Sequence, residues 1–310
     1  AHPPPKHKFW PQRDTMAGPA AKSMGRRARP HGGFVLGLAT VAAVLLAGGC
    51  YQRAAGAGAP EAGETFVRKM LNVPKEARLL AKSEHWIVEK IVTSHFPGAM
   101  SGPDLMKKVQ EAVKEHGLKK GNVVYGQSIA SDEINNDPGH ISTLLTRHYG
   151  KHFPMGGLGG VPSVGKTGFK AFLAHMQKDG HALVLFGPHI GYSPKGEPGI
   201  FLRRGQDSPS AACGAAMSAL SQASSGVSIP YDDSDMQQAW LRSKLAPHCA
   251  EIAAAAYPAV KLAMENYRIV EDEMKKIVDA PSGPGKLVLL GGIQINMPYP
   301  MPGFFMPLHF

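Results

Sequence analysis

Polar residues that can bind a metal ion or move a proton follow several strand-like stretches of this sequence. Asp132 and Glu133 come after one such stretch, His189 after the next, and Arg203 after a third, shortly before Cys213. In open α/β sheets, ligands bind at the carboxyl ends of the strands. A histidine and a cysteine that meet there can bind zinc, and two cysteines, one histidine and a water form a recognised catalytic site. Alone, one such pair is weak evidence, because buried cysteines are common.

Helical and strand-like stretches alternate along the chain, and they must position these residues. Apolar residues spaced three or four apart, bounded by Pro and Gly, predict helices, and continuous apolar runs predict buried strands. This alternation predicts an α/β fold with a mainly parallel sheet flanked by helices. The predicted strands are 121–130, 181–189, 200–205 and 286–297, and the predicted helices are 77–96, 103–117, 139–150, 166–180, 210–223 and a long stretch over 235–279.

The stretch "GVPSVGKT", residues 160–167, matches the phosphate-loop pattern G-x-x-x-x-G-K-[ST]. A phosphate loop normally follows a hydrophobic strand, and its fold needs an acidic residue at the end of a second strand to organise magnesium. The preceding "HYGKHFPMGGLG" is not strand-like, and the two strongest strands end without an acid. We therefore favour a glycine-rich turn that leads into a helix, with Lys166 and Thr167 in its first turn. A P-loop nucleotide-binding protein is the less favoured alternative.

The N-terminal 61 residues are expected to be a leader and linker, and residues 62–310 a single domain. From Met24, a basic segment, the apolar run 34–47 and the small residues before Cys50 are typical of a signal peptide. The run is shorter than the roughly 20 residues of a comfortable membrane span, so we expect no stable span in the mature chain. "LAGGC" also loosely resembles a bacterial lipoprotein signal, in which Cys50 would carry the lipid.

Charge and cysteine content exclude two further classes of protein. The net charge is +10, but seven of the 34 Lys and Arg residues and one of the 24 acidic residues lie in residues 1–50, so the remainder carries only +4. With no basic run interleaved with aromatics, we expect no nucleic-acid partner. Beyond Cys50, only Cys213 and Cys249 remain, which is too few for the disulfide framework of a small secreted domain.

Four long motifs resemble the limiting-carbon-dioxide-inducible protein B/C family of algae and some microbes, also called theta-type carbonic anhydrases. They are "GGLGGVPSVGKTGFKAFLAH", "LFGPHIGYSPKGEPG", "RRGQDSPSAACGAAMSAL" and the closing "GGIQINMPYPMPGFFMPLHF". The resemblance runs from about residue 62 to the end. It implies a β-carbonic-anhydrase-like α/β fold, usually dimeric, with zinc held by Cys, His and Cys.

Carried over by position, the resemblance implies that His189 and Cys213 are zinc ligands. The acid of the family's Asp-Arg pair falls on Asp132, and its arginine on Arg203, with Arg204 as the alternative. The family's first ligand lies in a C-x-D-E motif, but this chain reads "ASDE", so Ala130 stands at the position of that cysteine. A site without one of its three ligands should bind zinc much more weakly.

The implied reaction interconverts carbon dioxide and bicarbonate through a zinc-bound hydroxide. Asp132 would orient that hydroxide, and Arg203 would hold Asp132 in place. Ala130 makes this activity doubtful. It is a natural loss, an engineered change, or a variant rescued by another ligand, for which Cys249 is a poor candidate. The alternative to an enzyme is a non-catalytic carbonic-anhydrase-like subunit in algal carbon concentration.

Partners and location follow from the resemblance and the leader. We expect a homodimer or a hetero-oligomer with paralogues, and the apolar tail "PYPMPGFFMPLHF" would need to pack on its own domain or on a partner. A signal-peptide-like leader suits a plastid that is reached through the secretory route. A secreted protein or a membrane-anchored lipoprotein is the alternative.

Overall fold

The computed structural model describes residues 75–227, 229–281 and 284–310. The expected leader, its Cys50 and the domain boundary at residue 61 lie outside these residues, so they stay predictions. No helix in the described part of the chain is long and apolar enough to cross a membrane. The helices are α3 (Lys75–His95), α4 (Gly102–Glu115), α5 (Ile141–Tyr149), α6 (Gly165–Ala174), α7 (Gly214–Ser224), α8 (Met236–Leu245), α9 (Cys249–Ala253) and α10 (Pro258–Ile277).

A mixed sheet forms the centre of the fold, and its strands run in the order β1-β9-β8-β4-β2-β3, with β5 also paired to β8. The pairs β2–β3, β2–β4, β4–β8 and β5–β8 are parallel, whereas β9 is antiparallel to both β8 and β1. The strands are β1 (Met100–Ser101), β2 (Val123–Ile129), β3 (Phe153–Pro154), β4 (His181–Gly187), β5 (His189–Gly191), β8 (Leu287–Asn296) and β9 (Phe304–His309). The mainly parallel α/β sheet is therefore confirmed.

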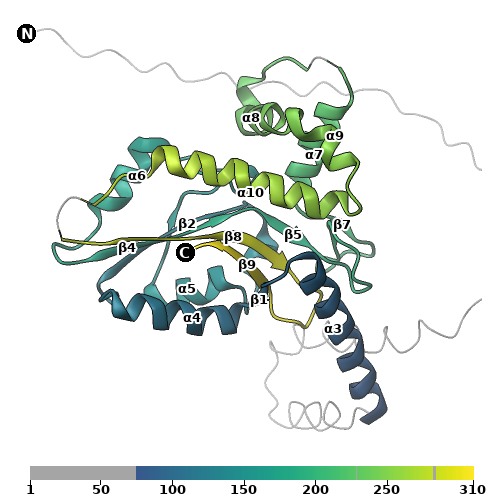
Figure 1. The fold of residues 1–310 in the computed structure, drawn as a ribbon, viewed down its shortest axis with the longest axis horizontal. Helices are drawn as coiled ribbons and strands as arrows, with labels where there is room; N and C mark the ends of the chain where they lie inside the picture. The colour runs from purple at the N-terminus through teal and green to yellow at the C-terminus, as the bar shows by residue number, and fades with distance from the viewer. Residues whose placement is uncertain (1–74, 228, 282–283) are drawn as a thin grey trace, which may run out of the picture. The chain divides into compact units, whose positions relative to one another are not determined.

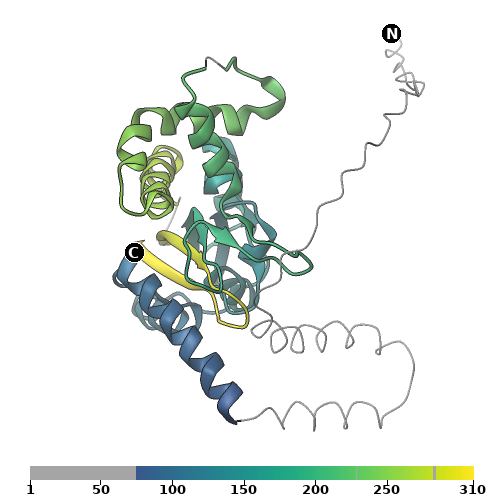
Figure 2. The ribbon, with the colours of Figure 1, turned by 90° about the vertical axis from the view of Figure 1, so that its right-hand side faces the viewer.

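Helices cover both faces of the sheet, with α6 and α10 along one face and α4 and α5 along the other (Figure 1). Strands buried on both faces are expected to be continuously apolar, and "HALVLFG" in β4 is buried from Ala182 onward. One core cluster joins the sheet to α6, α7, α8 and α10, and a second joins it to α4 and α5. Val88, Val92 and Phe96, in and just after the last turns of α3, belong to the first cluster, while the start of α3 leads away from the sheet (Figure 2).

Three predicted elements differ in the structure. The helical stretch 235–279 is three helices, because Pro247 lies in the 3-10 turn η4 (Ala246–His248) and Pro258 begins α10. The predicted strand 200–205 is only β6 (Ile200–Phe201), which pairs with β7 (Ser210–Ala211) in a separate two-stranded sheet. That pairing also removes the first residues of the predicted helix 210–223.

The apolar tail packs on its own domain as strand β9. Phe305 is fully buried and Phe304 nearly so, whereas Phe310 is exposed. Of the two expectations for the tail, burial on the same chain is the one that the structure supports for its first residues. Alternation of buried and exposed positions is weak in this strand, which hid it in the sequence.

Candidate functional site

The carboxyl ends of the central strands bring the sequence-predicted residues together. Ala130 directly follows β2, and His189 begins β5 just after β4 ends at Gly187. Cys213 follows β7 and is the N-cap residue of α7. Gly187 has φ +148, and a Cβ there would collide with the carbonyl oxygen of Gly292, so only glycine lets the chain turn into His189 at this point.

Asp132 is held by Arg203. The Nη2 atom of Arg203 lies 2.7 Å from Oδ2 of Asp132, its Nε lies 2.8 Å from Oε1 of Glu133, and its Nη1 donates to the hydroxyl of Ser210 at 2.5 Å. Arg204 instead lies over the ring of Tyr299, 4.1 Å from its centroid. Of the two arginines left open by the sequence, Arg203 is therefore the one that contacts Asp132. Their catalytic roles stay predictions.

The pKa of Asp132 is set by opposing effects. Burial raises this pKa, and the positive charges of His189 and Arg203 lower it, with a net rise. The Nε2 atom of His189 lies 3.5 Å from Oδ2 of Asp132. The carboxylate therefore stands between a guanidinium that neutralises it and an imidazole that can carry a proton.

His189 is fully enclosed and held from its other side. Its Nδ1 atom lies 2.8 Å from Oδ1 of Asn296, and its Nε2 atom is buried without a hydrogen-bond partner in the described part of the chain. Burial lowers the pKa of His189, but the negative charges of Cys213 and Asp132 raise it, and the net shift is upward. An unsatisfied buried nitrogen is costly, so Nε2 is suited to a bound cation or a proton.

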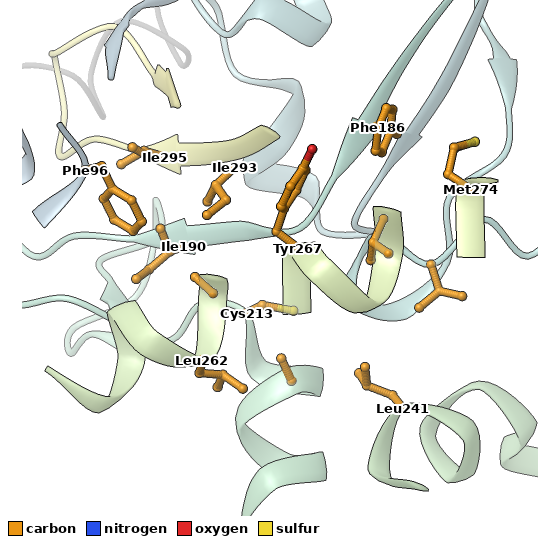
Figure 3. Packing of buried hydrophobic residues seen from close by; sticks show 14 of the residues in the cluster. Phe96, Phe186, Ile190, Cys213, Leu241, Leu262, Tyr267, Met274, Ile293 and Ile295 are labelled. Carbon is orange, nitrogen blue, oxygen red and sulfur yellow. The ribbon is translucent and has the colours of Figure 1, made fainter. Parts of the chain in front are cut away.

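Cys213 belongs to the larger core cluster (Figure 3), and its thiol interacts with the ring of His189. Burial raises the pKa of its thiol, while His189 and the backbone N–H of Ala216 lower it, and the net shift is downward. His189 and Cys213 line one small cavity of about 10 Å³. The structure thus brings together His189, Cys213, Asp132 and Arg203.

Ala130 is also at this site, but it offers only a methyl group. It is buried, and its carbonyl accepts from the side-chain nitrogen of Asn135 at 2.8 Å. Ala130 and Asp132 line a cavity of about 300 Å³ together with His152. Cys249 begins α9, and its thiol donates to the carbonyl of Leu245 at 3.6 Å, so it is engaged in its own helical segment.

Sequence reasoning missed three buried amides, those of Asn135, Gln294 and Asn296. Asn135 lies in η1 (Glu133–Asn136), the turn that follows Asp132, and the other two lie on β8. The side-chain nitrogens of Gln294 and Asn296 both donate to Oδ1 of Asn135, at 2.9 and 3.1 Å. Polar residues at alternate positions of the apolar run "GGIQINM" were the available signal, since a buried polar side chain needs a partner.

The stretch "GVPSVGKT" covers the turn before α6 and the first residues of that helix. Gly160 has φ +83, and a Cβ there would lie 2.2 Å from the carbonyl oxygen of Gly187, next to the strand end that carries His189. Lys166 is in the first turn of α6, as expected. One expectation was wrong in detail, because Phe153–Pro154 in "HYGKHFPMGGLG" form the short edge strand β3. This strand ends before the turn Leu158–Gly160 and does not lead directly into the stretch.

Residues 99–310 match the family described as limiting CO2-inducible proteins B/C beta carbonic anhydrases. The chain belongs to this family. Among solved structures, the chain is similar to PtLCIB4, a homologue of the limiting CO2-inducible protein LCIB. The two sequences are 33% identical and the two structures superpose with a TM-score of 0.66, over 70% of this chain and 92% of that chain.

Two further solved structures support the family's fold. A variant of PtLCIB4 is 31% identical, with a TM-score of 0.65 over 72% of this chain and 92% of that chain. The structure of limiting CO2-inducible protein LCIB itself is 23% identical, with a TM-score of 0.54 over 69% and 90%, and shows likeness of fold only. No curated protein matches.

In this member of the limiting CO2-inducible family, the donors present do not complete a zinc site. No three His, Cys, Asp or Glu side chains within residues 75–227, 229–281 and 284–310 are grouped so that they could hold a metal ion. A catalytic zinc is held by three protein ligands. The donor set offers the free Nε2 of His189 and the thiol of Cys213, while Ala130 contributes none.

Proposed function

We propose that this chain keeps the carbon dioxide and bicarbonate site of a carbonic anhydrase but has little or no hydration activity of its own. The observation that carries the proposal is the buried methyl group of Ala130 beside Asp132. The rest of the site supports its descent from such an enzyme, because Asp132 is paired with Arg203 and His189 presents an unpartnered nitrogen.

The missing thiolate matters for both number and charge of ligands. Apparent zinc binding by four protein ligands amounts to about 10–16 kcal/mol, or about 3 kcal/mol for each ligand. Such a loss weakens binding about a hundredfold. A single thiolate, that of Cys213, also leaves a zinc dication half neutralised in a buried site, which is a further cost.

Asp132 and Arg203 retain a defined chemical capacity without the third ligand. The carboxylate can accept a hydrogen bond from a hydroxyl group placed in the site, and Arg203 fixes the carboxylate in one orientation. The two residues can therefore select and orient a protonated oxygen.

Metal analysis of the purified chain beside an Ala130→Cys variant tests this proposal. We expect the unaltered chain to retain far less than one zinc per subunit after dialysis and to show little hydration of carbon dioxide, and the variant to gain both. Ala130→Ser is the matched control, because it adds one atom at the same position without a thiolate. One tightly bound zinc and full hydration activity in the unaltered chain would show the proposal to be wrong.

A second function, that of a non-catalytic subunit, is favoured by the hydrogen bonds that the site keeps without a third ligand. The pair of Asp132 with Arg203 and the amides of Asn135 and Asn296 are all in place although Ala130 is not a ligand. We propose that the chain assembles with itself or with relatives that carry the cysteine, in algal carbon concentration. Co-purification with such a relative tests this, and a strictly solitary homodimer in cells that contain one would contradict it.

The leader leads us to propose delivery to a plastid through the secretory route. A fluorescent reporter fused to residues 24–75 tests the address, and a cytosolic signal would contradict it. Secretion would point to the alternative of a secreted protein, and retention at a membrane to that of an anchored lipoprotein.

A further inference from the structure

The three buried amides beside the site each have a fixed orientation. The side-chain nitrogen of Asn135 donates to the carbonyl of Ala130 at 2.8 Å, that of Gln294 to the carbonyl of Asn135 at 3.1 Å, and that of Asn296 to the carbonyl of Ile134 at 3.2 Å. A backbone carbonyl can only accept a hydrogen bond. In each amide the nitrogen must therefore face that carbonyl, and the side-chain oxygen must face the other way.

This orientation determines where His189 carries its proton. With its nitrogen turned to Ile134, Asn296 presents Oδ1 to Nδ1 of His189 at 2.8 Å. An amide oxygen accepts, so Nδ1 must donate. In the neutral ring the remaining nitrogen, Nε2, then holds a lone pair, and it lies 3.5 Å from Oδ2 of Asp132.

We propose that Asn296 is a positioning residue, which keeps the proton of the neutral His189 ring on Nδ1 and directs the free Nε2 into the site. The second contact of Asn296 extends this role. Its nitrogen also donates to Oδ1 of Asn135, whose own nitrogen holds the carbonyl of Ala130. Asn296 thereby connects the imidazole to the turn that carries Ala130 and Asp132.

Gln294 provides a matched comparison for a purely structural role. It lies two residues earlier on β8, is as completely buried, and donates to the same Asn135. Its remaining side-chain atom, Oε1, has no partner in the described part of the chain, and Gln294 makes no side-chain hydrogen bond to His189. Loss of either amide should cost stability, but only loss of Asn296 should release the imidazole.

Nitrogen NMR of the full chain labelled with 15N-histidine tests the inference. The signals of His189 are assigned by their absence in His189→Gln, and the spectra are read at the alkaline end of a pH series, where the ring is neutral. We expect the Nδ1–H form in the unaltered chain and in Gln294→Ala, and a mixture of both forms in Asn296→Ala. Asn296→Asp, which keeps the acceptor oxygen, should restore the Nδ1–H form.

Two results would overturn the inference. One is an Nε2–H form in the unaltered chain, a result that does not depend on whether any variant folds. The other is an equal change in Gln294→Ala and Asn296→Ala, which would make the amides structural only. The inference rests on the proposed function only in taking His189 as a site residue. Because the form of the ring is read without metal, its failure is distinguishable from a failure of the zinc prediction.

Discussion

The site has a β8 side, which contains Asn296 and the residues that it contacts, and a β2 side, which contains Ala130 and Asp132. The two sides differ in the side-chain contacts that they make. On the β8 side, Asn296 contacts His189 and is itself held by Asn135. On the β2 side, Ala130 presents a buried methyl group where the resemblance to the family implies a cysteine ligand. The fold explains part of this difference, because a buried amide without its partners costs about 1–3 kcal/mol, whereas alanine in place of a small buried cysteine leaves no polar group unsatisfied. Folding thus maintains the β8 side whether or not a metal is bound.

Restoring the donor on the β2 side should have the largest effect on metal binding. If Ala130→Cys tightens zinc binding about a hundredfold, a zinc concentration equal to the Kd of the unaltered chain is about 100 times the Kd of the variant. It stabilises the unaltered chain by only about 0.4 kcal/mol and the variant by about 2.7 kcal/mol. For a domain of this size that shift raises the Tm by about 5 °C or more. Calorimetry with and without zinc measures it.

The matched control for this prediction carries Ala130→Cys together with Cys213→Ser. It has the same number of cysteines near the site as the unaltered chain, and it should lose most of the zinc-dependent shift. An equal shift in the unaltered chain and in Ala130→Cys would mean that the β2 side is not short of a donor.

The glycine stretch 160–167 supports the strand end that carries His189, and it gives the second prediction. Gly160→Ala forces a positive φ and a collision with the carbonyl of Gly187, which together should cost about 3–5 kcal/mol. Gly165 also has a positive φ, +58, but a Cβ there meets nothing within 4 Å. Gly165→Ala should therefore cost only about 1–2 kcal/mol.

Urea unfolding of both glycine variants measures this difference. Equal losses would show that close approach to Gly187 contributes nothing, and that backbone conformation alone explains the glycines. Binding of ATP with magnesium by the unaltered chain, lost in Gly160→Ala, would instead revive the phosphate-loop alternative.

Replacing Arg203 should damage the site more than replacing Arg204. Arg203→Ala leaves Asp132, which is largely buried, without its guanidinium partner, and an uncompensated buried charge costs about 2–3 kcal/mol in a partly accessible position. Arg204→Ala removes only the contact with the ring of Tyr299, which contributes about 0.5–1 kcal/mol at an exposed site. The unfolding free energies at pH 7 provide the comparison, and a reversed order would contradict the assignment of Arg203.

Much of the fold could be predicted because burial on both faces makes the central strands continuously apolar. β4 and β8 are such runs, and both were located from the sequence. The two-residue strand β3 and the tail strand β9 were missed, because their pairing depends on partners distant in the chain rather than on a local pattern. The prediction of one long helical stretch over 235–279 failed at Pro247 and Pro258. That prediction treated the stretch as a whole, although each proline interrupts a helix.

The site was predictable to a different extent. His189 and Cys213 were found from motifs, but a motif names positions and not contacts. The sequence favoured Arg203 and kept Arg204 as the alternative, and the path of the chain after β6 brings Arg203 to Asp132. Asn296 lay within the closing motif but received no role from it, since its importance lies in an orientation imposed by the carbonyl of Ile134, 162 residues away.

His140, the N-cap residue of α5, gives the prediction of smallest effect. Its ring is buried against Gly303, and its Nδ1 atom has no partner in the described residues. Burial, with a smaller contribution from the charge of His189, lowers the pKa of His140 to about 4. Between pH 6.5 and about 4 the unfolded chain binds this proton and the folded chain does not, so the folded state loses stability as the pH falls, by about 1–2 kcal/mol at pH 5. Above pH 6.5 this residue has no effect. Urea unfolding at pH 5 and pH 7 measures this effect, and His140→Gln should reduce the difference in unfolding free energy between the two pH values. If the variant left that difference unchanged, the ring would be protonated as easily in the folded protein as in the unfolded chain.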